Sequence, residues 1–344
     1  MSATALPDRF EDVAALEDFM TEPTAELVAD LSALPGDIIV LGVAGKMGPT
    51  LARLARRAAP HKRIMGVARF SDASVRAALE RADVETIACD LLDRRAVEAL
   101  PKLANVVYMA AMKFGASDNP ALTWAMNVHA PAIVAEAFPA SRIVAFSTGC
   151  VYPFVPIAEG GATEATPAIP PPGDYAASCV GRERMFEHFS VRLGTPGRIV
   201  RLNYAIDMRY GVLHDIGTKV RDGQPIDLAM GHVNVIWQGD ANAVALRSLG
   251  RTTSPTTPIN VTGSQIIPVR WLAEEFGRRL GRAPKLTGAE APLGWLSDPS
   301  RMVAEFGQPR VPLDRMIAWT ADWLTRGMVS LGKPTHYEVR DGRF

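Results

Sequence analysis

Three glycines near the start of the chain have a spacing that could hold a phosphate group. Gly42, Gly45 and Gly48 lie in the segment GVAGKMG. The first glycine permits a tight turn, and the others let a pyrophosphate and a neighbouring strand approach the backbone. A helix that begins here also offers free amide donors and the positive end of its dipole. Although one or two glycines could mark a plain turn, three at this spacing favour dinucleotide binding.

The type of dinucleotide depends on the residue that follows the next apolar segment. An acidic side chain there would accept hydrogen bonds from the ribose hydroxyls of NAD. This chain has Arg69, with Ser71 close behind it, and arginine can pair with the 2′-phosphate of NADP. We therefore expect NADP to be preferred and NAD to be possible, because an exposed arginine can also stack on the adenine beside NAD.

The surrounding pattern supplies the strand and the helix that these residues need. Residues 37–43 form a continuous apolar run, typical of a buried parallel strand, and residues 49–59 repeat with the period of a helix. Apolar strands and helices then alternate as far as a strand at 197–203. The pattern predicts an α/β fold, a Rossmann-like doubly wound parallel sheet with a smaller C-terminal substrate-binding lobe.

The same pattern predicts the domain organisation. The dinucleotide-binding domain is expected at residues 37–203, with residues 232–263 partly returning to it. The other expected parts are a helical extension packed on the outside of the fold at 1–36, a substrate-binding lobe at 204–231 and 264–330, and a tail at 331–344. Residues 152–174 are rich in proline and glycine and predict a long loop.

Composition narrows the class of partner. Lysine plus arginine (37) balance aspartate plus glutamate (37) without a block of like charge, so neither nucleic acid nor an anionic membrane is expected to bind. The chain shows neither a signal-peptide pattern nor a long apolar window, which predicts a cytoplasmic protein. Three scattered cysteines predict free thiols and no metal site. A small-molecule partner is therefore expected.

From the glycine segment onward, over roughly residues 37–326, the chain resembles the extended short-chain dehydrogenases/reductases, the NAD-dependent epimerase/dehydratase group that acts largely on sugars. Cys89-Asp90-Leu91, Met109-Ala110-Ala111, Asn127-Val128 and PINVTG match this family in order. The cofactor-binding residues that the glycine loop, the Arg69 position and this resemblance imply are Gly42, Gly45, Lys46, Met47, Gly48, Arg69, Asp90, Leu91, Ala110, Ala111, Asn127 and Tyr175. Relatives pair through two long helices, here at about 119–137 and 174–190, which implies a homodimer.

The resemblance also implies catalytic residues. Thr148, in the segment FSTGCVYP, matches the family's substrate-binding hydroxyl, and Tyr175 matches its proton-carrying acid/base. The family has a lysine four residues after the tyrosine, whereas this chain has Cys179. A phenol with a pKa near 10 needs a nearby cation or a hydrogen-bonded ribose, and a small neutral thiol cannot replace an ammonium.

Two basic residues could compensate for the missing lysine. Arg182 follows Tyr175 by seven residues, which places it within about 20° of the same helix face but ~10.5 Å further along. Lys113 matches a position that faces the substrate in several relatives. We prefer Lys113 of the two, although either could be a solvated surface charge.

Three functions remain open at this stage. The first is an NAD(P)-dependent oxidoreductase that acts on a hydroxyl or keto group of a small sugar, sugar acid or lactone. Nucleotide sugars and dehydration are not favoured, because Val233 replaces a diphosphate-binding arginine and Gly149-Cys150 replace an Asp-Glu pair of the relatives. The second is an NAD(P)-binding sensor or scaffold without turnover. The third is a sugar epimerase that uses Cys150 and His214, as in the GDP-fucose synthase branch.

Overall fold

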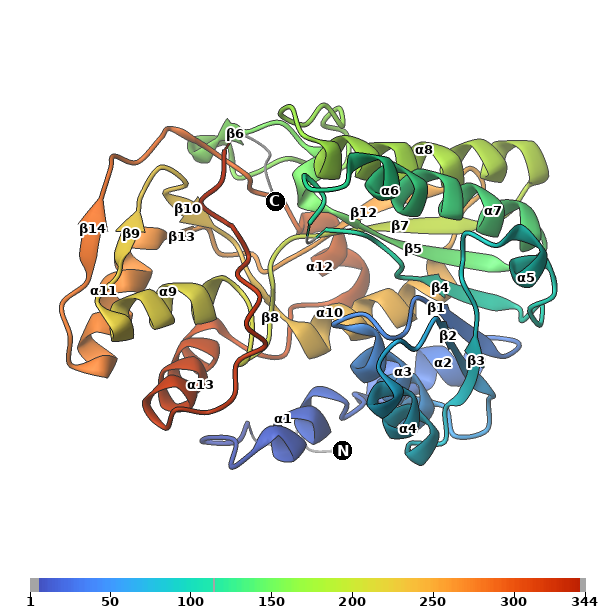
Figure 1. The fold of residues 1–344 in the computed structure, drawn as a ribbon, viewed down its shortest axis with the longest axis horizontal. Coiled ribbons are helices and arrows are strands. Elements are labelled where there is room, and N and C mark those ends of the chain that lie inside the picture. The colour runs from blue at the N-terminus through green and yellow to red at the C-terminus, as the bar shows by residue number, and fades with distance from the viewer. Residues whose placement is uncertain (1–5, 114, 341–344) are drawn as a thin grey trace.

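The computed structural model describes residues 6–113 and 115–340. The ends of the predicted extension and tail, residues 1–5 and 341–344, and residue 114 lie outside this description. Its centre is a seven-stranded sheet in the order β12-β7-β5-β4-β1-β2-β3, with neighbouring strands parallel (Figure 1). The strands are β1 (Ile38–Leu41), β2 (Ile64–Ala68), β3 (Glu85–Ala88), β4 (Asn105–Tyr108), β5 (Arg142–Thr148), β7 (Gly197–Leu202) and β12 (Thr257–Val261). This confirms the predicted Rossmann-like α/β fold.

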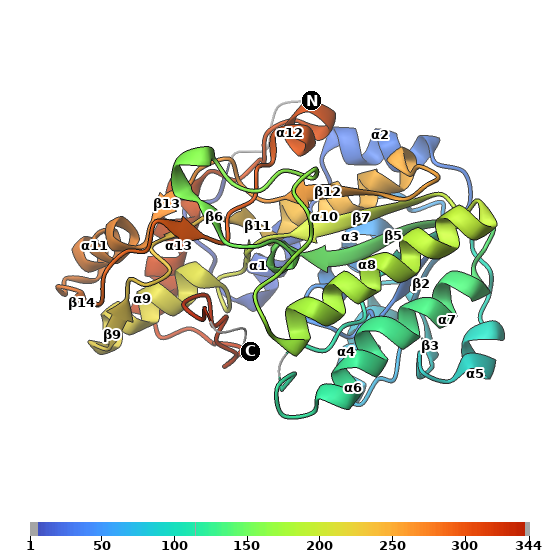
Figure 2. The same ribbon diagram turned by 90° about the horizontal axis from the view of Figure 1, so that it is seen from above.

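Helices cover both faces of the sheet, which is why its inner strands are buried and mostly apolar. Every residue of β1 and β4 is buried. One face carries α2 (Ala25–Ala33), α3 (Gly48–Ala58), α4 (Ala73–Arg81), α10 (Gln238–Arg247) and α12 (Ser300–Phe306). The other face carries α5 (Arg94–Glu98), α6 (Pro120–Trp124), α7 (Ala130–Ala137) and α8 (Asp174–Leu193), and Figure 2 shows α8 alongside α6 and α7. The strand order reverses between β1 and β4, where ligands of such sheets bind.

A second lobe has its own core. The three helices α9 (Val212–Asp222), α11 (Val269–Leu280) and α13 (Leu313–Thr325) pack around buried tryptophans such as Trp237 and Trp323. Four two-stranded ladders accompany them: β8 (Ala205–Ile206) with β11 (Ile236–Trp237), β9 (Pro225–Asp227) with β14 (Lys285–Thr287), β10 (His232–Val233) with β13 (Ile267–Pro268), and β6 (Val155–Pro156) with β15 (Leu293–Gly294). The predicted loop at 152–174 therefore contains one short strand, and also a 3₁₀ turn at Ile157–Glu159.

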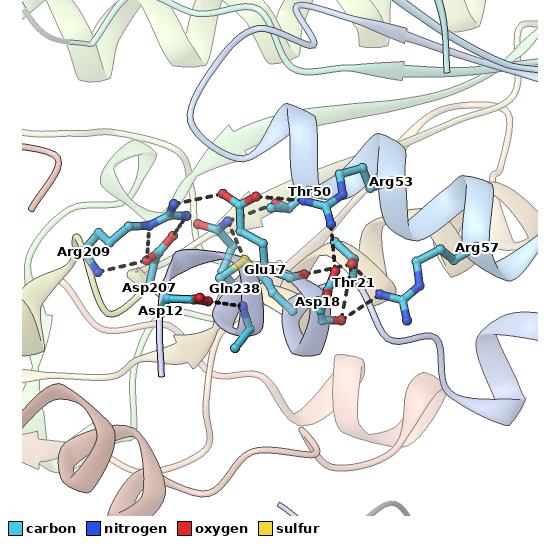
Figure 3. A network of polar contacts seen from close by, with 12 residues as sticks. Asp12, Glu17, Asp18, Thr21, Thr50, Arg53, Arg57, Asp207, Arg209 and Gln238 are labelled. Atoms are coloured by element: carbon cyan, nitrogen blue, oxygen red, sulfur yellow. Dashed lines mark hydrogen bonds and ion pairs between the residues drawn. The ribbon is translucent and has the colours of Figure 1, made fainter. Parts of the chain in front are cut away.

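The N-terminal helix α1 (Val13–Met20) ties the two lobes together (Figure 3). Its Glu17 carboxylate accepts hydrogen bonds from Arg53 of α3 at 2.7 Å and from Arg209, which follows β8, at 2.9 Å. Leu16 and Met20 of the same helix lie in the core of the second lobe. The N-terminal extension therefore packs on the outside of the fold and also contributes side chains to the core of the second lobe.

The chain after α13 forms a strap, defined here as residues 328–340. In Figure 1 it runs as the dark red segment past α9 towards β6. The Thr335 amide and hydroxyl donate to Asp215 of α9 at 2.8 and 2.5 Å, and Lys219 pairs with Glu338 at 2.8 Å. Tyr337 is completely buried. These contacts bring the strap to the same end of the sheet as the glycine segment.

None of the helices in the described part of the chain has the length and apolarity that a membrane span requires.

Candidate functional site

A cavity of about 240 Å³ lies at the carboxyl ends of β1, β4 and β5. Its wall combines the glycine loop, the residues after β4 and β5, the start of α8, the segment around Tyr204 and Tyr210 of the second lobe, and Thr335 of the strap. A larger hollow of about 740 Å³ between α2, α10 and residues 306–310 contains none of the predicted site residues. The smaller cavity is therefore the candidate site.

The glycine loop is shaped to receive a ligand as well as to pack. Gly42 has φ +87°, and an added Cβ would lie 2.5 Å from the Ala110 amide nitrogen, while a Cβ on Gly48 would lie 2.2 Å from the Val43 carbonyl oxygen. The fold itself therefore requires these two glycines. A Cβ on Gly45 would meet only the Gly42 carbonyl oxygen, at an ordinary 3.4 Å, so a glycine there suits a group that approaches from outside.

The helix that follows the loop has no side-chain cap at its N-terminus, where a phosphate could bind. The residue before α3 is Met47, which makes no side-chain hydrogen bond to the first turn of the helix. The Gly48 amide donates to the Gly45 carbonyl at 3.2 Å and Pro49 has no N–H, so the attraction for an anion at this end comes mainly from the helix dipole. The loop and the helix together fit the pyrophosphate of a dinucleotide.

Lys46 points away from this helix, toward the second lobe. Its Nζ atom lies 3.7 Å from the centre of the Tyr210 ring. Burial lowers the pKa of Lys46 to about 7, because the partly opposing attraction of Asp207 does not offset the loss of hydration. Repulsion from Arg209 and Lys113 acts in the same direction as burial.

The residues expected along the rest of a dinucleotide lie on the same edge of the sheet. Arg69 directly follows β2 and is exposed, and Asp90 and Leu91 follow β3. The Asp90 carboxylate caps the local turn by accepting from the Leu92 amide at 3.0 Å. Ala110 and Ala111 follow β4, and Ala111 is part of the cavity wall.

The hydroxyls of Thr148 and Tyr175 meet in the wall of the cavity. Thr148 ends β5, and its Oγ1 atom accepts from the Cys150 amide at 3.2 Å, which fixes the rotamer. Tyr175 lies in the first turn of α8 and is 8% exposed. Burial raises the pKa of Tyr175 well above its ordinary value, against the charge of Arg182 and a side-chain hydrogen bond with Thr148.

The two cysteines near this pair differ in their access to the cavity. Cys150 is part of the cavity wall, whereas Cys179 is fully buried and is not among the lining residues. Burial raises the pKa of both thiols. Each is therefore a neutral thiol at ordinary pH, and Cys179 on α8 shares a side-chain hydrogen bond with Tyr175.

Arg182 reaches the cavity from about two turns further along α8 than Tyr175. It is only 3% exposed, and its Nη1 and Nη2 atoms donate to the Phe146 carbonyl at 3.0 Å and to Asn127 Oδ1 at 2.8 Å. Its Nε atom is buried and has no hydrogen-bond partner within the part of the chain that the structure describes. The helical spacing from Tyr175 was the sequence signal for this residue, but its burial was not predicted.

Asn127, expected to bind cofactor, makes four hydrogen bonds to other residues of the chain. Its amide nitrogen donates to the Met112 carbonyl and to Ser178 Oγ, and its oxygen accepts from the Met112 amide and from Arg182. This uses the full hydrogen-bonding capacity of the side chain. Asn127 thus holds the segment before Lys113 against α8 and is absent from the cavity wall.

Of the remaining two candidates, Lys113 lines the cavity and His214 does not. The Lys113 Nζ atom donates to the Thr335 carbonyl at 3.3 Å and lies 5.8 Å from the centre of the Tyr175 ring. Both ring nitrogens of His214 are engaged, with the Met208 carbonyl at 3.0 Å and Ser330 Oγ at 2.9 Å. His214 is not part of the cavity wall, so the structure does not bring it together with Cys150.

Several residues of the wall were not predicted. Asn203, Tyr204 and Tyr210 follow β7 and β8, and Thr335 comes from the strap. No motif in the sequence marks these positions. Tyr204 has φ +43°, an uncommon backbone conformation for a residue other than glycine. Within the described residues, no cluster of histidine, cysteine, aspartate or glutamate could hold a metal ion.

Comparison with known proteins gives a family and a fold. A UDP-glucose 4-epimerase from Thermus thermophilus, in complex with NAD, superposes with a TM-score of 0.69 at 21% identity, covering 85% of this chain and 100% of the epimerase. DesIV, a dTDP-glucose 4,6-dehydratase from Streptomyces venezuelae with bound NAD, superposes with a TM-score of 0.71 at 18% identity, covering 84% and 97%.

Such low identities establish the fold alone. No curated protein matches the chain in sequence. The family evidence is the match of residues 38–206, which include the glycine loop, Thr148 and Tyr175, to the model of the NAD dependent epimerase/dehydratase family. Residues 38–206 thus form a domain of the NAD-dependent epimerase/dehydratase family, as the resemblance of the chain to the extended short-chain dehydrogenases/reductases predicted.

Proposed function

We propose that this protein is an NAD(P)-dependent oxidoreductase that acts on a hydroxyl or keto group of a small carbohydrate. The observation that carries the proposal is the pairing of Thr148 and Tyr175 hydroxyls in the wall of a cavity that also includes the glycine loop. A nicotinamide cofactor would supply or accept the hydride. The two hydroxyls would hold the reacting oxygen, and Tyr175 would give or take the accompanying proton.

The proposal requires a cation near the phenol, because burial alone holds the proton on Tyr175. Arg182 meets this need better than Lys113, the residue preferred from the sequence. The charge of Arg182 lowers the Tyr175 pKa, whereas the strongest charge interactions of Lys113 are with Cys150 and Asp215. The unpartnered Nε of Arg182 is also suited to a ribose hydroxyl of the cofactor. We therefore assign the lysine's role to Arg182.

The proposed cofactor is inferred from residues at the carboxyl edge of the sheet, namely the glycine loop and Arg69. The Thermus epimerase and DesIV both hold NAD, and the glycine loop of this chain fits the same pyrophosphate group. Arg69 stands exposed at the carboxyl end of β2, where its guanidinium could pair with a 2′-phosphate. We therefore propose that NADP is preferred and that NAD also binds.

The alternatives have less support. Epimerisation through Cys150 and His214 lacks a shared cavity for the two residues. A sensor without turnover would have no need for the hydrogen bond between Thr148 and Tyr175, yet the chain keeps it. The oxidoreductase proposal does not need His214 in the cavity, and it gives the hydrogen bond between Thr148 and Tyr175 a role.

The experiment is a screen of sugars, aldonates and lactones with NAD and NADP, followed by the absorbance of the reduced dinucleotide. Tyr175→Phe should lower kcat by about 10²- to 10⁴-fold, the usual contribution of a general acid/base, while dinucleotide binding by calorimetry persists. Tyr108→Phe is the matched control, because the Tyr108 hydroxyl lies 3.5 Å from the Met126 carbonyl and outside the cavity wall. Unchanged turnover in Tyr175→Phe would overturn the assignment.

We further propose a homodimer through the helices α6, α7 and α8. Leu122 and Trp124 of α6 and Val191 and Leu193 of α8 are large apolar side chains with 38–68% exposure, which suits an interface. A homodimer should appear as twice the chain mass of 37.1 kDa in light scattering. A monomer mass at micromolar concentration would refute it.

A further inference from the structure

The charges in the cavity wall are of one sign. Lys46, Lys113 and Arg182 line the cavity, whereas none of the lining residues that the structure describes is aspartate or glutamate. A small, partly dry site with this wall attracts an anion, because charges interact more strongly where water is excluded.

The nearest carboxylates are already engaged. Asp207 accepts from Arg209 at 2.8 and 3.0 Å. Asp215 accepts from the amide and the hydroxyl of Thr335, and burial raises its pKa. Neither carboxylate belongs to the cavity wall. They moderate the positive potential of the cavity without occupying it.

Both lysines lie on the side of the cavity that faces the second lobe. Lys46 lies over the ring of Tyr210, and Lys113 donates to the Thr335 carbonyl of the strap while it approaches the ring of Tyr175. Their ammonium groups repel each other, and burial lowers the pKa of each. An anion between them would relieve both effects.

The pyrophosphate of a dinucleotide does not account for both lysines. The glycine loop and the N-terminus of α3, which has no side-chain cap, already fit a pyrophosphate. Lys113 follows β4 and is held by the strap, close to the Tyr175 phenol that would handle the substrate proton. The anion is therefore a group on a small substrate.

We propose that the substrate carries a carboxylate, which the ammonium groups of Lys46 and Lys113 bind, so that the protein acts on a small sugar acid. The inference rests on the proposed oxidoreductase function and narrows its substrate to acids over neutral sugars and lactones. Anchoring the carboxylate beside Tyr175 would also select which hydroxyl of the acid faces Thr148 and the phenol. Lys46 and Lys113 are then specificity-determining residues.

The test compares sugar acids with their uncharged amides, which keep the same hydroxyls. At a saturating dinucleotide concentration, wild type should turn over the acid with a kcat/KM about 10- to 100-fold higher than the amide, the effect of a hydrogen bond to a charged group. Lys113→Met should bring this ratio close to one, and Lys46→Met should lower it as well. Lys102→Met is the matched control, because Lys102 lies against Phe138, outside the cavity wall.

The outcomes separate this inference from the proposed function. Equal kcat/KM for acid and amide in wild type, or a preference for sugar phosphates over acids, would overturn the carboxylate proposal and leave the oxidoreductase standing. If no compound is turned over, the acid is titrated by calorimetry into the protein saturated with reduced dinucleotide. Binding that Lys113→Met weakens at least about tenfold supports the carboxylate site even without turnover, and no binding of any acid overturns it.

Discussion

Two arginines buried in the same part of the sheet have very different partners. Arg201 of β7 is 4% exposed and donates from Nε and Nη2 to the Glu183 carboxylate, and from Nη1 to the Tyr152 hydroxyl. Arg182 of α8 is 3% exposed and donates only to neutral oxygens, and its Nε has no partner among the described residues. Arg201 forms a direct ion pair with a carboxylate, whereas Arg182 forms none among the described residues and is attracted to Glu183 only at longer range.

The difference indicates which arginine serves stability and which serves the site. A buried charge without a counter-ion is costly, so its retention needs another explanation. Arg182 lines the cavity and acts on the Tyr175 pKa, whereas Arg201 lies behind the cavity wall. We therefore expect substitutions of Arg201 to change mainly stability and substitutions of Arg182 to change mainly turnover.

The largest expected effect is the loss of the Arg201 ion pair. Arg201→Met leaves the carboxylate of Glu183, which is 1% exposed, buried without its partner, and should lower the free energy of unfolding by about 3–5 kcal/mol. Urea unfolding measures this loss. Arg63→Met, which breaks the exposed pair with Glu85, should cost no more than about 1 kcal/mol. A similar cost for both variants would show that Arg201 is not the structural arginine of the pair.

A smaller stability effect but a clear kinetic one is expected for Arg182→Met. The variant loses two hydrogen bonds to neutral groups but removes an unpaired buried charge, so its unfolding free energy should change by less than about 2 kcal/mol. Its kcat should fall about 10- to 100-fold, because the cation that favours the phenolate is gone. Since the cation lowers the Tyr175 pKa, the pH dependence of oxidation should shift to higher pH. Arg182→Lys should recover part of the activity.

Cys179→Lys serves as the counter-test of the same assignment. Restoring a lysine at the position that the family favours would place an ammonium in a completely buried position, where the Arg182 charge already acts. If Arg182 has taken over the lysine's role, activity should fall. A rise in activity would mean that Arg182 contributes nothing and that the site had lost its cation.

The sequence was most informative where a local pattern has a single structural outcome. The apolar runs IIVL and NVVY predict strands buried on both faces, and three spaced glycines predict the loop between β1 and α3. The role of Arg182 could not be read in the same way, because a residue seven positions after Tyr175 can face either solvent or core. Only the packing of α8 against β5 and α7 decides this.

The strap was beyond prediction for a different reason. Its sequence has no helical or alternating period, and its position depends on long-range bonds to Asp215 and Lys219. Its Ser330 bonds to His214, a residue that the resemblance had suggested for chemistry. Its Thr335 bonds to Lys113 and joins the cavity wall. The parts of the site that come from the strap are thus the least visible in the sequence.

The smallest expected effect on stability concerns a third arginine, which is exposed and so extends the comparison to the surface. Arg69 follows β2 and pays no burial cost, so Arg69→Ala should leave the unfolding free energy almost unchanged. If its guanidinium pairs with a 2′-phosphate, the variant should bind NADP about 1.5–3 kcal/mol more weakly and NAD nearly as before, which calorimetry with both dinucleotides measures. Arg63→Ala, at the opposite end of β2, should change neither affinity. Parallel losses of NAD and NADP would show that Arg69 stacks on the adenine, and a wild type that prefers NAD would exclude the phosphate pairing.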